Sequence, residues 1–225
     1  DALLGTELRF AKLALDGDVL EAGIIDTLVC DCCQTDVAIS ARGPLVIYRD
    51  RTEDEIRDVV VRMHDGSAWQ APIALGAEGW HIEGCPVNGP AIAASEEDVA
   101  AAWFTAADDM PRVRFASSRD GGQSFGPALD IDMTGAFGQV DVVLLEDATA
   151  VGTWWRRAEG NRTALALRTV SHDGELGPIL AIAENETSHP LAVPEAAAIG
   201  DALLVTWTDS ADGGRVRVAR VENLR

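Results

Sequence analysis

The residues with the most specific chemistry in this sequence are its four cysteines. Cys30, Cys32 and Cys33 form a C-x-C-C cluster, and Cys85 lies in a second polar segment, just before Asn88-Gly89-Pro90. An even number of cysteines in an exported domain favours disulfides, here with Cys85 paired to one member of the cluster. Cys32 and Cys33 are adjacent, so a bridge between them would strain the peptide, and a thiol of the cluster is expected to be left over.

A metal site is an alternative use of the same cysteines. Thiolates bind soft ions such as copper(I) and zinc, and His81 or His189 would add a nitrogen ligand. The C-x-C-C spacing differs from the C-x-x-C spacing of structural zinc sites, which argues against this interpretation. A reactive free thiol is the third alternative. The sequence leaves all three open, and copper or zinc is the candidate cofactor.

Two charged segments combine guanidinium groups, carboxylates and aromatic rings. They are Tyr48-Arg49-Asp50-Arg51 with Glu53, and Trp154-Trp155-Arg156-Arg157 with Glu159. Arginine forks bind carboxylates in a bidentate manner, so these segments suit a glycan or a small acidic ligand. A glycoside hydrolase also needs two carboxylates that face each other across a pocket. The candidate catalytic residues are Asp50, Glu53 and Glu159, and the candidate ligand-binding residues are Arg49, Arg51, Asn88, Trp155, Arg156, Arg157 and His189.

The charge balance excludes several classes of partner. The chain of 225 residues has a formal net charge of −19, and Lys12 is its only lysine. Nucleic acids and anionic membrane surfaces require basic patches, so neither is an expected partner. No apolar run approaches the roughly 20 residues of a membrane helix, so we expect no membrane insertion.

Asp-Gly turns recur along the chain with a period of about 50 residues, which is typical of propeller blades. Each follows an alternating strand such as Arg112-Val113-Arg114-Phe115-Ala116, in which every second residue is apolar. The turns are at Asp16-Gly17, Asp65-Gly66, Asp120-Gly121 and Asp173-Gly174. Upstream of the strands, apolar runs end in one aromatic residue each, at Tyr48, Trp103, Trp154 and Trp207.

This register predicts an all-β chain with about four propeller blades and part of a fifth. The predicted blades span about residues 1–25 (partial), 35–78, 88–132, 138–184 and 192–225 (partial), in a single domain 1–225. A propeller is stable when its ring closes and covers the edges of the first and last blades. Because those blades lack strands, we expect a portion of a longer propeller, six-bladed or incomplete. The start at Asp1 indicates processing or trimming, and we expect a secreted or periplasmic protein.

The turn between Ser118 and Phe125 carries a family resemblance. Ser118, Asp120, Gly122 and Phe125 match the Ser-x-Asp-x-Gly-x-x-aromatic pattern of an Asp box, so the chain resembles the sialidase (BNR repeat) superfamily. The resemblance implies a sialidase-like β-propeller and structural roles for these four residues. The aspartate binds N–H groups of the turn, the glycine accepts a positive φ, and the aromatic ring fills the space between blades.

The same resemblance implies an exo-sialidase-like glycoside hydrolase acting on sialic-acid-like or other acidic glycans. Such enzymes use an arginine triad, a tyrosine nucleophile assisted by a glutamate, and an aspartate acid. This sequence departs from that set, because its single tyrosine, Tyr48, occupies a packing position of the repeat and an Arg-Ile-Pro motif is missing. A noncatalytic ligand- or protein-binding propeller and a copper- or zinc-binding propeller are the alternatives. We expect any site on the face opposite the Asp-Gly turns, where all four cysteines fall.

Overall fold

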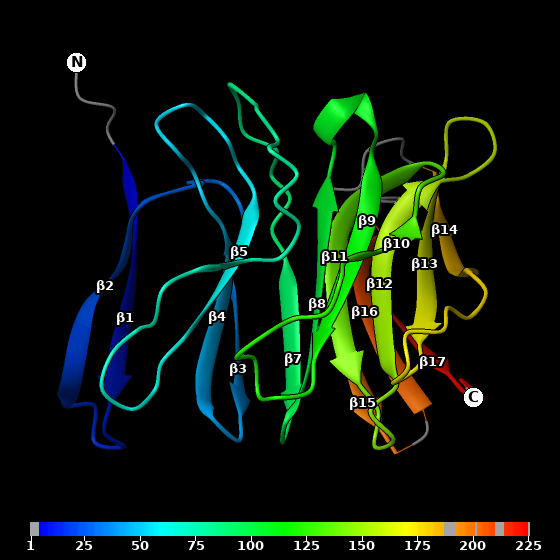
Figure 1. The fold of residues 1–225 in the computed structure, drawn as a ribbon. Helices are drawn as coiled ribbons and strands as arrows, with labels where there is room; N and C mark the ends of the chain where they lie inside the picture. The colour runs from blue at the N-terminus through cyan, green and yellow to red at the C-terminus, as the bar shows by residue number, and fades with distance from the viewer. Residues whose placement is uncertain (1–4, 187–191, 201, 210–213, 225) are drawn as a thin grey trace.

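The computed structural model describes residues 5–186, 192–200, 202–209 and 214–224. These residues form five antiparallel sheets, with two, four, four, four and three strands along the chain (Figure 1). The strands are β1 (Thr6–Leu13), β2 (Val19–Val29), β3 (Asp36–Ser40), β4 (Gly43–Arg49), β5 (Val59–Met63), β6 (Ile73–Ala74), β7 (Ala91–Ser95), β8 (Asp98–Thr105), β9 (Arg112–Ser118), β10 (Leu129–Asp132), β11 (Ala136–Leu144), β12 (Ala150–Arg157), β13 (Thr163–Val170), β14 (Leu180–Asn185), β15 (Glu195–Ile199), β16 (Ala202–Asp209) and β17 (Arg215–Val221). A short 3-10 helix, η1 (Ala107–Asp109), joins β8 to β9. In the described part of the chain, no helix is long and apolar enough to cross a membrane.

Each four-stranded sheet has the order of a propeller blade, with consecutive strands as hydrogen-bonded neighbours. Strand β9 illustrates why the sequence forms such a sheet. Side chains on a strand point alternately to opposite faces. Val113 and Phe115 are therefore buried on one face, while Arg112 and Arg114 are half-buried on the other. The prediction of an all-β propeller architecture is confirmed.

The core consists of apolar layers between successive sheets. Trp103 packs between the second and third sheets, Trp154 between the third and fourth, and Trp155 between the fourth and fifth. All three are fully buried. Tyr48 is also fully buried, in the layer between the first and second sheets, which confirms its predicted packing role. Burial of rings of this size stabilises the sheet stack through the hydrophobic effect.

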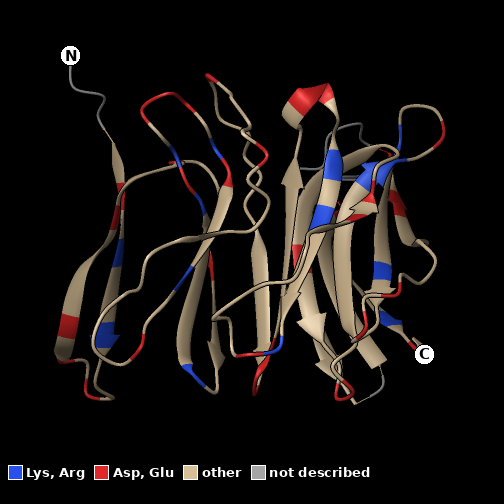
Figure 2. Cartoon of the chain, viewed as in Figure 1, with Lys and Arg blue, Asp and Glu red and all other residues tan. Residues whose placement is uncertain are grey.

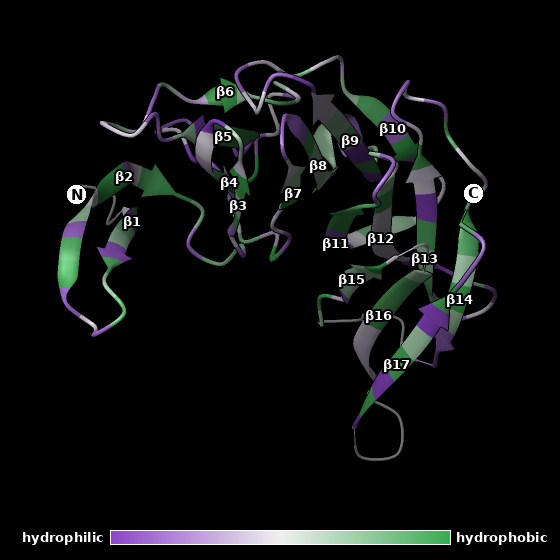
Figure 3. Cartoon of the chain, turned by 90° about the horizontal axis from the view of Figure 1, so that it is seen from below, coloured by the Kyte–Doolittle hydropathy of each residue, from purple (hydrophilic) through white to green (hydrophobic). Residues whose placement is uncertain are grey.

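Seen along the strands, the sheets follow one another along an open arc (Figure 3). The first strands of four sheets, β3, β7, β11 and β15, lie on the concave side of the arc, and successive ones contact each other. Carboxylates join these strands. Asp36 accepts a hydrogen bond from the Ile92 N–H at 2.8 Å, and Asp141 accepts one from the Ala196 N–H at 2.6 Å.

The two ends of the strands carry different connections. The Asp-Gly turns lie at one end, which we call the back face, and the β4–β5, β6–β7, β8–β9 and β12–β13 connections lie at the other, the front face (Figure 1). Figure 2 shows that acidic residues gather mainly in the connections at both ends, and less often along the strands.

The turn that joins β9 to β10 on the back face is held by its own residues. Asp120 accepts hydrogen bonds from the Ser118 hydroxyl at 2.7 Å and from the Ser124 N–H at 2.9 Å. Burial opposes ionisation of Asp120, but the bonds from Ser124 and Ser118 outweigh it and lower its pKa to about 2. Gly122 has a φ of 91°, and a Cβ there would lie 2.7 Å from Leu45. Phe125 packs against the layer between the second and third sheets.

Candidate functional site

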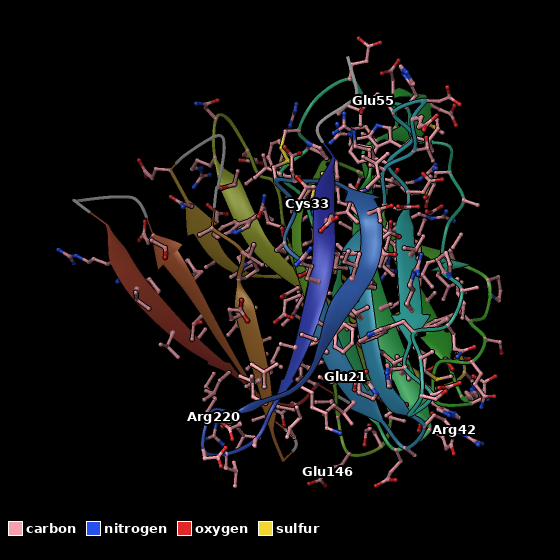
Figure 4. All side chains as sticks on the ribbon, turned by 90° about the vertical axis from the view of Figure 1, so that its left-hand side faces the viewer. Glu21, Cys33, Arg42, Glu55, Glu146 and Arg220 are labelled. Atoms are coloured by element: carbon pink, nitrogen blue, oxygen red, sulfur yellow. A yellow bond between two sulfur atoms is a disulfide. The ribbon has the colours of Figure 1, made fainter. Side chains whose placement is uncertain are left out.

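The front face brings the predicted cysteine loops together. Cys32, between β2 and β3, forms a disulfide with Cys85, between β6 and β7, at a Cα–Cα distance of 6.1 Å. The prediction that Cys85 pairs with one member of the cluster is confirmed. The bridge links the entrances of the second and third sheets. Figure 4 shows Cys33 and Glu55 toward this end of the molecule, and Arg42 and Glu146 toward the back face.

Cys30 and Cys33 are free thiols beside this bridge. Their Sγ atoms lie 2.9 Å apart, and the Sγ of Cys30 lies 3.7 Å from that of Cys32. The hydrogen bond between Cys30 and Cys33 and the one from Arg57 lower the pKa of Cys30 to about 5, although burial opposes them. The hydrogen bond to Cys30 and burial raise the pKa of Cys33. Cys30 and Cys33 have C-x-x-C spacing, which the C-x-C-C description of the cluster concealed.

The sulfur atoms of Cys30, Cys32 and Cys33 lie within 4.8 Å of one another and could hold a metal ion. Within the described ranges, the groups with metal-binding geometry include no histidine. His81 is exposed and pairs with the β4–β5 connection through an isolated bridge. The predicted ligand His189 falls outside the described residues.

Arg49 lies beneath the front face, with only 2% of its surface exposed. Its Nε and Nη2 atoms donate to the Asn88 carbonyl at 3.0 and 2.8 Å, Nη1 donates to the Arg57 carbonyl, and Nη2 also donates to that of Phe104. The guanidinium stacks 4.9 Å from the ring centre of Trp80. These contacts connect three front-face segments, so Arg49 supports the surface from within.

Arg57 is a second buried arginine, which the sequence analysis did not select. Its Nε and Nη2 atoms donate to Glu55 at 3.2 and 2.8 Å, and its Nη1 donates to Cys30 at 3.4 Å. Arg51 pairs with the same Glu55 carboxylate. Hydrogen bonds from Arg51 and Arg57 lower the pKa of Glu55. The one feature of the sequence that could have pointed to a role for Arg57 is its position between a run of charged residues and an alternating strand.

A cavity of about 510 Å³ opens on the front face beside the disulfide. Its lining combines two arginines that share one carboxylate, two further carboxylates and part of the bridge. The lining residues are Asp31, Arg51, Glu55, Arg57, Glu83, Gly84 and Cys85. Such a set offers fixed donors for a carboxylate or sugar hydroxyls, together with acceptors for other hydroxyls. Of the predicted site residues, Arg51 and Cys85 line this cavity.

The predicted catalytic carboxylates lie outside the cavity lining. Asp50 is half-buried, accepts a hydrogen bond from the Arg51 N–H at 2.9 Å, and has its pKa raised by burial. Glu53 is exposed in the β4–β5 connection. Glu159 is exposed in the β12–β13 connection, two sheets away. Their catalytic role stays a prediction.

The second charged segment is organised around a buried carboxylate. Asp132 accepts hydrogen bonds from Trp154 Nε1 at 2.8 Å and from Arg156 Nε at 2.9 Å. Trp155 is fully buried and donates to the Ala192 carbonyl. Arg157 is exposed and lies over the Phe137 ring. The fourth sheet thus uses Trp155 and Arg156 in its own packing, and Arg157 presents the accessible guanidinium.

Asn88 links the second front-face loop to the fourth sheet. Its side-chain Nδ2 donates to the Phe137 carbonyl at 2.8 Å, and its Oδ1 accepts from the Gln139 N–H at 2.7 Å. Asn88 is buried, and the adjacent Gly89 N–H donates to Gln34. A residue predicted for ligand binding therefore lies among backbone groups of neighbouring blades.

Two carboxylates of the inner strands were also not selected from the sequence. Burial raises the pKa of Asp141 to about 7, and nearby Glu195 and Asp36 raise it further, against hydrogen bonds from Ala196 and Val142. The sequence did contain a pattern that marks these two residues, because Asp36 and Asp141 occupy the same place in two Gln-x-Asp-Val segments. Asp36 begins β3 and Asp141 lies within β11, and each of these is the first strand of its blade. A carboxyl group of this kind can gain or lose a proton near neutral pH.

Comparisons with known proteins agree with this architecture. No protein-family model matches the chain, and no curated protein matches its sequence. It is similar in structure to a Hadza microbial sialidase, with a TM-score of 0.60 and 18% identity over 100% of this chain and 53% of that one. It is also similar to a protein of unknown function from Dyadobacter fermentans DSM 18053 (TM-score 0.52, 16% identity, 93% of this chain and 65% of that one) and to the GH43 protein BlXynB from Bacillus licheniformis (TM-score 0.50, 11% identity, 87% and 40%).

These likenesses establish the fold. The chain has an all-β, sialidase-like propeller architecture and spans 53% of the length of the sialidase. Identities of 11 to 18% do not carry an activity from one protein to another.

Proposed function

We propose that the front-face cavity binds a glycan that carries a carboxylate or several hydroxyl groups, and that the chain belongs to a sialidase-like glycoside hydrolase. The observation that carries the proposal is the pair of guanidinium groups, Arg51 and Arg57, fixed on the shared carboxylate of Glu55 in the cavity wall. Fixed forks lose little entropy when they bind a planar anion. The likeness of the fold to a sialidase is further support.

Hydrolysis needs two carboxylates on opposite sides of the glycosidic bond. Asp50, Glu53 and Glu159 are the candidates from the sequence, and Asp31 and Glu83 in the cavity wall are additional ones. The full activity, on sialic-acid-like or other acidic glycans, is part of this proposal. So is the assignment of the Asp-Gly turns to BNR repeats, which the geometry of the Asp120 turn supports.

Noncatalytic glycan binding is the second candidate, and one observation favours it. The only tyrosine of the sequence, Tyr48, is fully buried and donates a hydrogen bond to Asp26 at 2.7 Å. Burial and this hydrogen bond raise its pKa. Tyr48 is therefore unavailable as a nucleophile for a sugar, and these residues would bind a glycan without forming a tyrosyl intermediate.

Two further parts of the proposal concern the cysteines. Copper(I) or zinc is the alternative occupant of the cluster of Cys30, Cys32 and Cys33, and it would take Cys32 as a ligand only with the Cys32–Cys85 bridge reduced. The Cys32–Cys85 disulfide supports a location outside the cytoplasm, because such bridges persist in oxidising compartments. We therefore propose that the protein is secreted or periplasmic.

Calorimetric titration with N-acetylneuraminic acid, beside a neutral sugar such as galactose, tests the proposed binding. We expect the acidic sugar to bind more tightly, and Arg51→Gln to weaken it by about tenfold, a loss of about 1.4 kcal/mol. Arg119→Gln on the back face is the matched control and should leave the affinity unchanged. Equal affinity of the wild type and Arg51→Gln would contradict the proposed site. A fluorogenic sialoside distinguishes the two candidate functions, because a hydrolase releases its fluorophore and a noncatalytic binding protein does not.

A further inference from the structure

The four cysteines form one continuous group of sulfur atoms with two oxidation levels. Cys32 and Cys85 are oxidised to a disulfide, while Cys30 and Cys33 are thiols. The Sγ of Cys30 touches both sides, at 2.9 Å from Cys33 and 3.7 Å from Cys32. A thiol in van der Waals contact with a disulfide sulfur is placed for exchange, since that reaction proceeds by attack of a thiolate on sulfur.

The four cysteines differ in exposure, so that Cys30 could act as a buried nucleophile and Cys85 as an exposed leaving group. Cys30 is 5% exposed and receives a hydrogen bond from the Arg57 guanidinium, which stabilises a thiolate. Cys33 is half-buried, and Cys85 is exposed at the edge of the front-face cavity. A sulfur released from the bridge would therefore emerge in a cavity that contains Arg51 and Arg57.

We propose that Cys30 and Cys33 are a redox-active dithiol that exchanges with the Cys32–Cys85 bridge. The Cys30 thiolate attacks the Sγ of Cys32; a Cys30–Cys32 bond forms, the Cys32–Cys85 bond breaks, and Cys85 leaves as a thiolate. Cys33 then gives its proton to Cys85 and attacks Cys30, which releases the Cys32 thiolate. The Cys30–Cys33 pair loses two electrons and the Cys32–Cys85 pair gains them, so no outside oxidant is needed.

The distances favour a dithiol over a metal site in this state. Two thiolates on one tetrahedral zinc ion, each about 2.3 Å from it, lie about 3.8 Å apart. Cys30 and Cys33 are closer than this, at 2.9 Å, and Cys32 is already committed to the bridge. Exchange has a structural consequence, because moving the bridge to Cys30–Cys33 would remove the covalent link between the β6–β7 and β2–β3 connections and leave noncovalent contacts, such as the hydrogen bonds of the Ile56–His81 bridge, to hold the β6–β7 connection. The oxidation state of the cysteines would then control the shape of the front-face cavity.

Disulfide mapping in glutathione redox buffers tests the proposal directly. The protein is equilibrated at a series of ratios of reduced to oxidised glutathione, quenched with acid, alkylated and cleaved before aspartate residues without reduction. Cleavage before Asp31 separates Cys30 from Cys32 and Cys33, so Cys32–Cys85 and Cys30–Cys33 give different linked peptides. Fragmentation of the peptide that links Cys30 to the 31–35 segment shows whether Cys32 or Cys33 carries the alkyl group, which distinguishes Cys30–Cys33 from the Cys30–Cys32 intermediate. With one bridge per molecule, we expect both Cys32–Cys85 and Cys30–Cys33 species. At the oxidising end, we expect both bridges in one molecule.

Variants at single sulfurs separate the two steps. Cys30→Ser should form Cys32–Cys85 as its only internal bridge at every ratio at which a bridge is present, while Cys33→Ser should stop after the first step and accumulate the Cys30–Cys32 bond. Both retain the sulfurs of the native bridge, and thermal unfolding checks that they fold. The proposal is overturned if the wild type shows only Cys32–Cys85, with Cys30 and Cys33 alkylated at every ratio. Four free thiols with a stoichiometric metal ion, in protein purified without chelator or reductant, would also overturn it.

Discussion

Asp120 on the back face and Arg49 on the front face differ in how far along the chain their hydrogen-bond partners lie. On the back face, the partners of Asp120 lie within four residues of it in the chain. On the front face, Arg49 donates to carbonyls of Asn88 and Phe104, from two other segments of the chain. Asp120 therefore stabilises its own hairpin, whereas Arg49 joins segments of different blades. Contacts between blades on the back face are made by other residues, such as Arg119, which donates to the His172 carbonyl and to Asp173. Loss of the Arg49 side chain should therefore cost more stability than loss of the Asp120 carboxylate.

The strongest test of this comparison is Arg49→Met. The substitution keeps an unbranched chain of similar length but leaves three buried carbonyls without their charged donor, so we expect a loss of roughly 3 to 5 kcal/mol in the free energy of unfolding. Urea unfolding measures it. The exposed back-face control, Arg119→Met, should change stability by less than about 0.5 kcal/mol. A loss below 1 kcal/mol for Arg49→Met would mean that the guanidinium does not hold the blades together.

Cys85→Ser should have the next largest effect. Removal of the bridge gives the unfolded chain back the freedom of a loop that spans 53 residues, and roughly 2 to 4 kcal/mol of stability should be lost. Thermal unfolding without reductant measures the loss. Wild-type protein treated with reductant serves as the comparison and should approach the variant. Unchanged melting of Cys85→Ser would show that the bridge is not a structural staple.

On the back face, Asp120→Ala should cost about 1 to 2 kcal/mol, because it removes the acceptor of three local hydrogen bonds. Asp173→Ala is the matched variant at an exposed turn and should cost less than about 0.5 kcal/mol. The pKa of Asp120 is lowered to about 2, so its contribution is present above pH 4 and lost as the pH falls toward 2. Glycan affinity should not change. If Asp120→Ala abolished binding in a folded protein, the separation of the two faces would be wrong.

The smallest expected effect concerns the inner strands. Burial raises the pKa of Asp141 from 3.8 to about 7, so its protonated form stabilises the fold fully below pH 4, and this contribution is lost as the pH rises to about 7. Asp141→Asn imitates the protonated form. The free energy of unfolding of the wild type should fall between pH 4.5 and pH 8 as Asp141 ionises. The fall should be smaller in the variant, by at least about 1 kcal/mol. Parallel urea unfolding curves at both pH values check this, and identical pH slopes would contradict it.

Prediction from the sequence succeeded where the determining interactions are local. Alternation of apolar and polar residues gave the strands, and the recurring Asp-Gly pairs gave the turns and the period of the sheets. Gly17, Gly66, Gly121 and Gly174 all have positive φ, which is a local requirement that a single residue type reveals. The pairing of Cys85 with the cysteine cluster also followed, because the repeat brings equivalent loops of adjacent blades together.

What the sequence could not decide is the depth and partner of each charged side chain. Arg49 and Arg51 are two residues apart, yet one lies under three carbonyls and the other lines a cavity. In the sequence, Arg57 and Asp141 resemble ordinary surface charges, and only the packing of neighbouring segments shows that they are buried or half-buried. The sequence by itself determined the repeated blade, since strand and turn propensities act over a few residues. Only the tertiary structure decided which charges are buried and which cysteine of the cluster forms the bridge, because these contacts join residues about 40 to 50 positions apart.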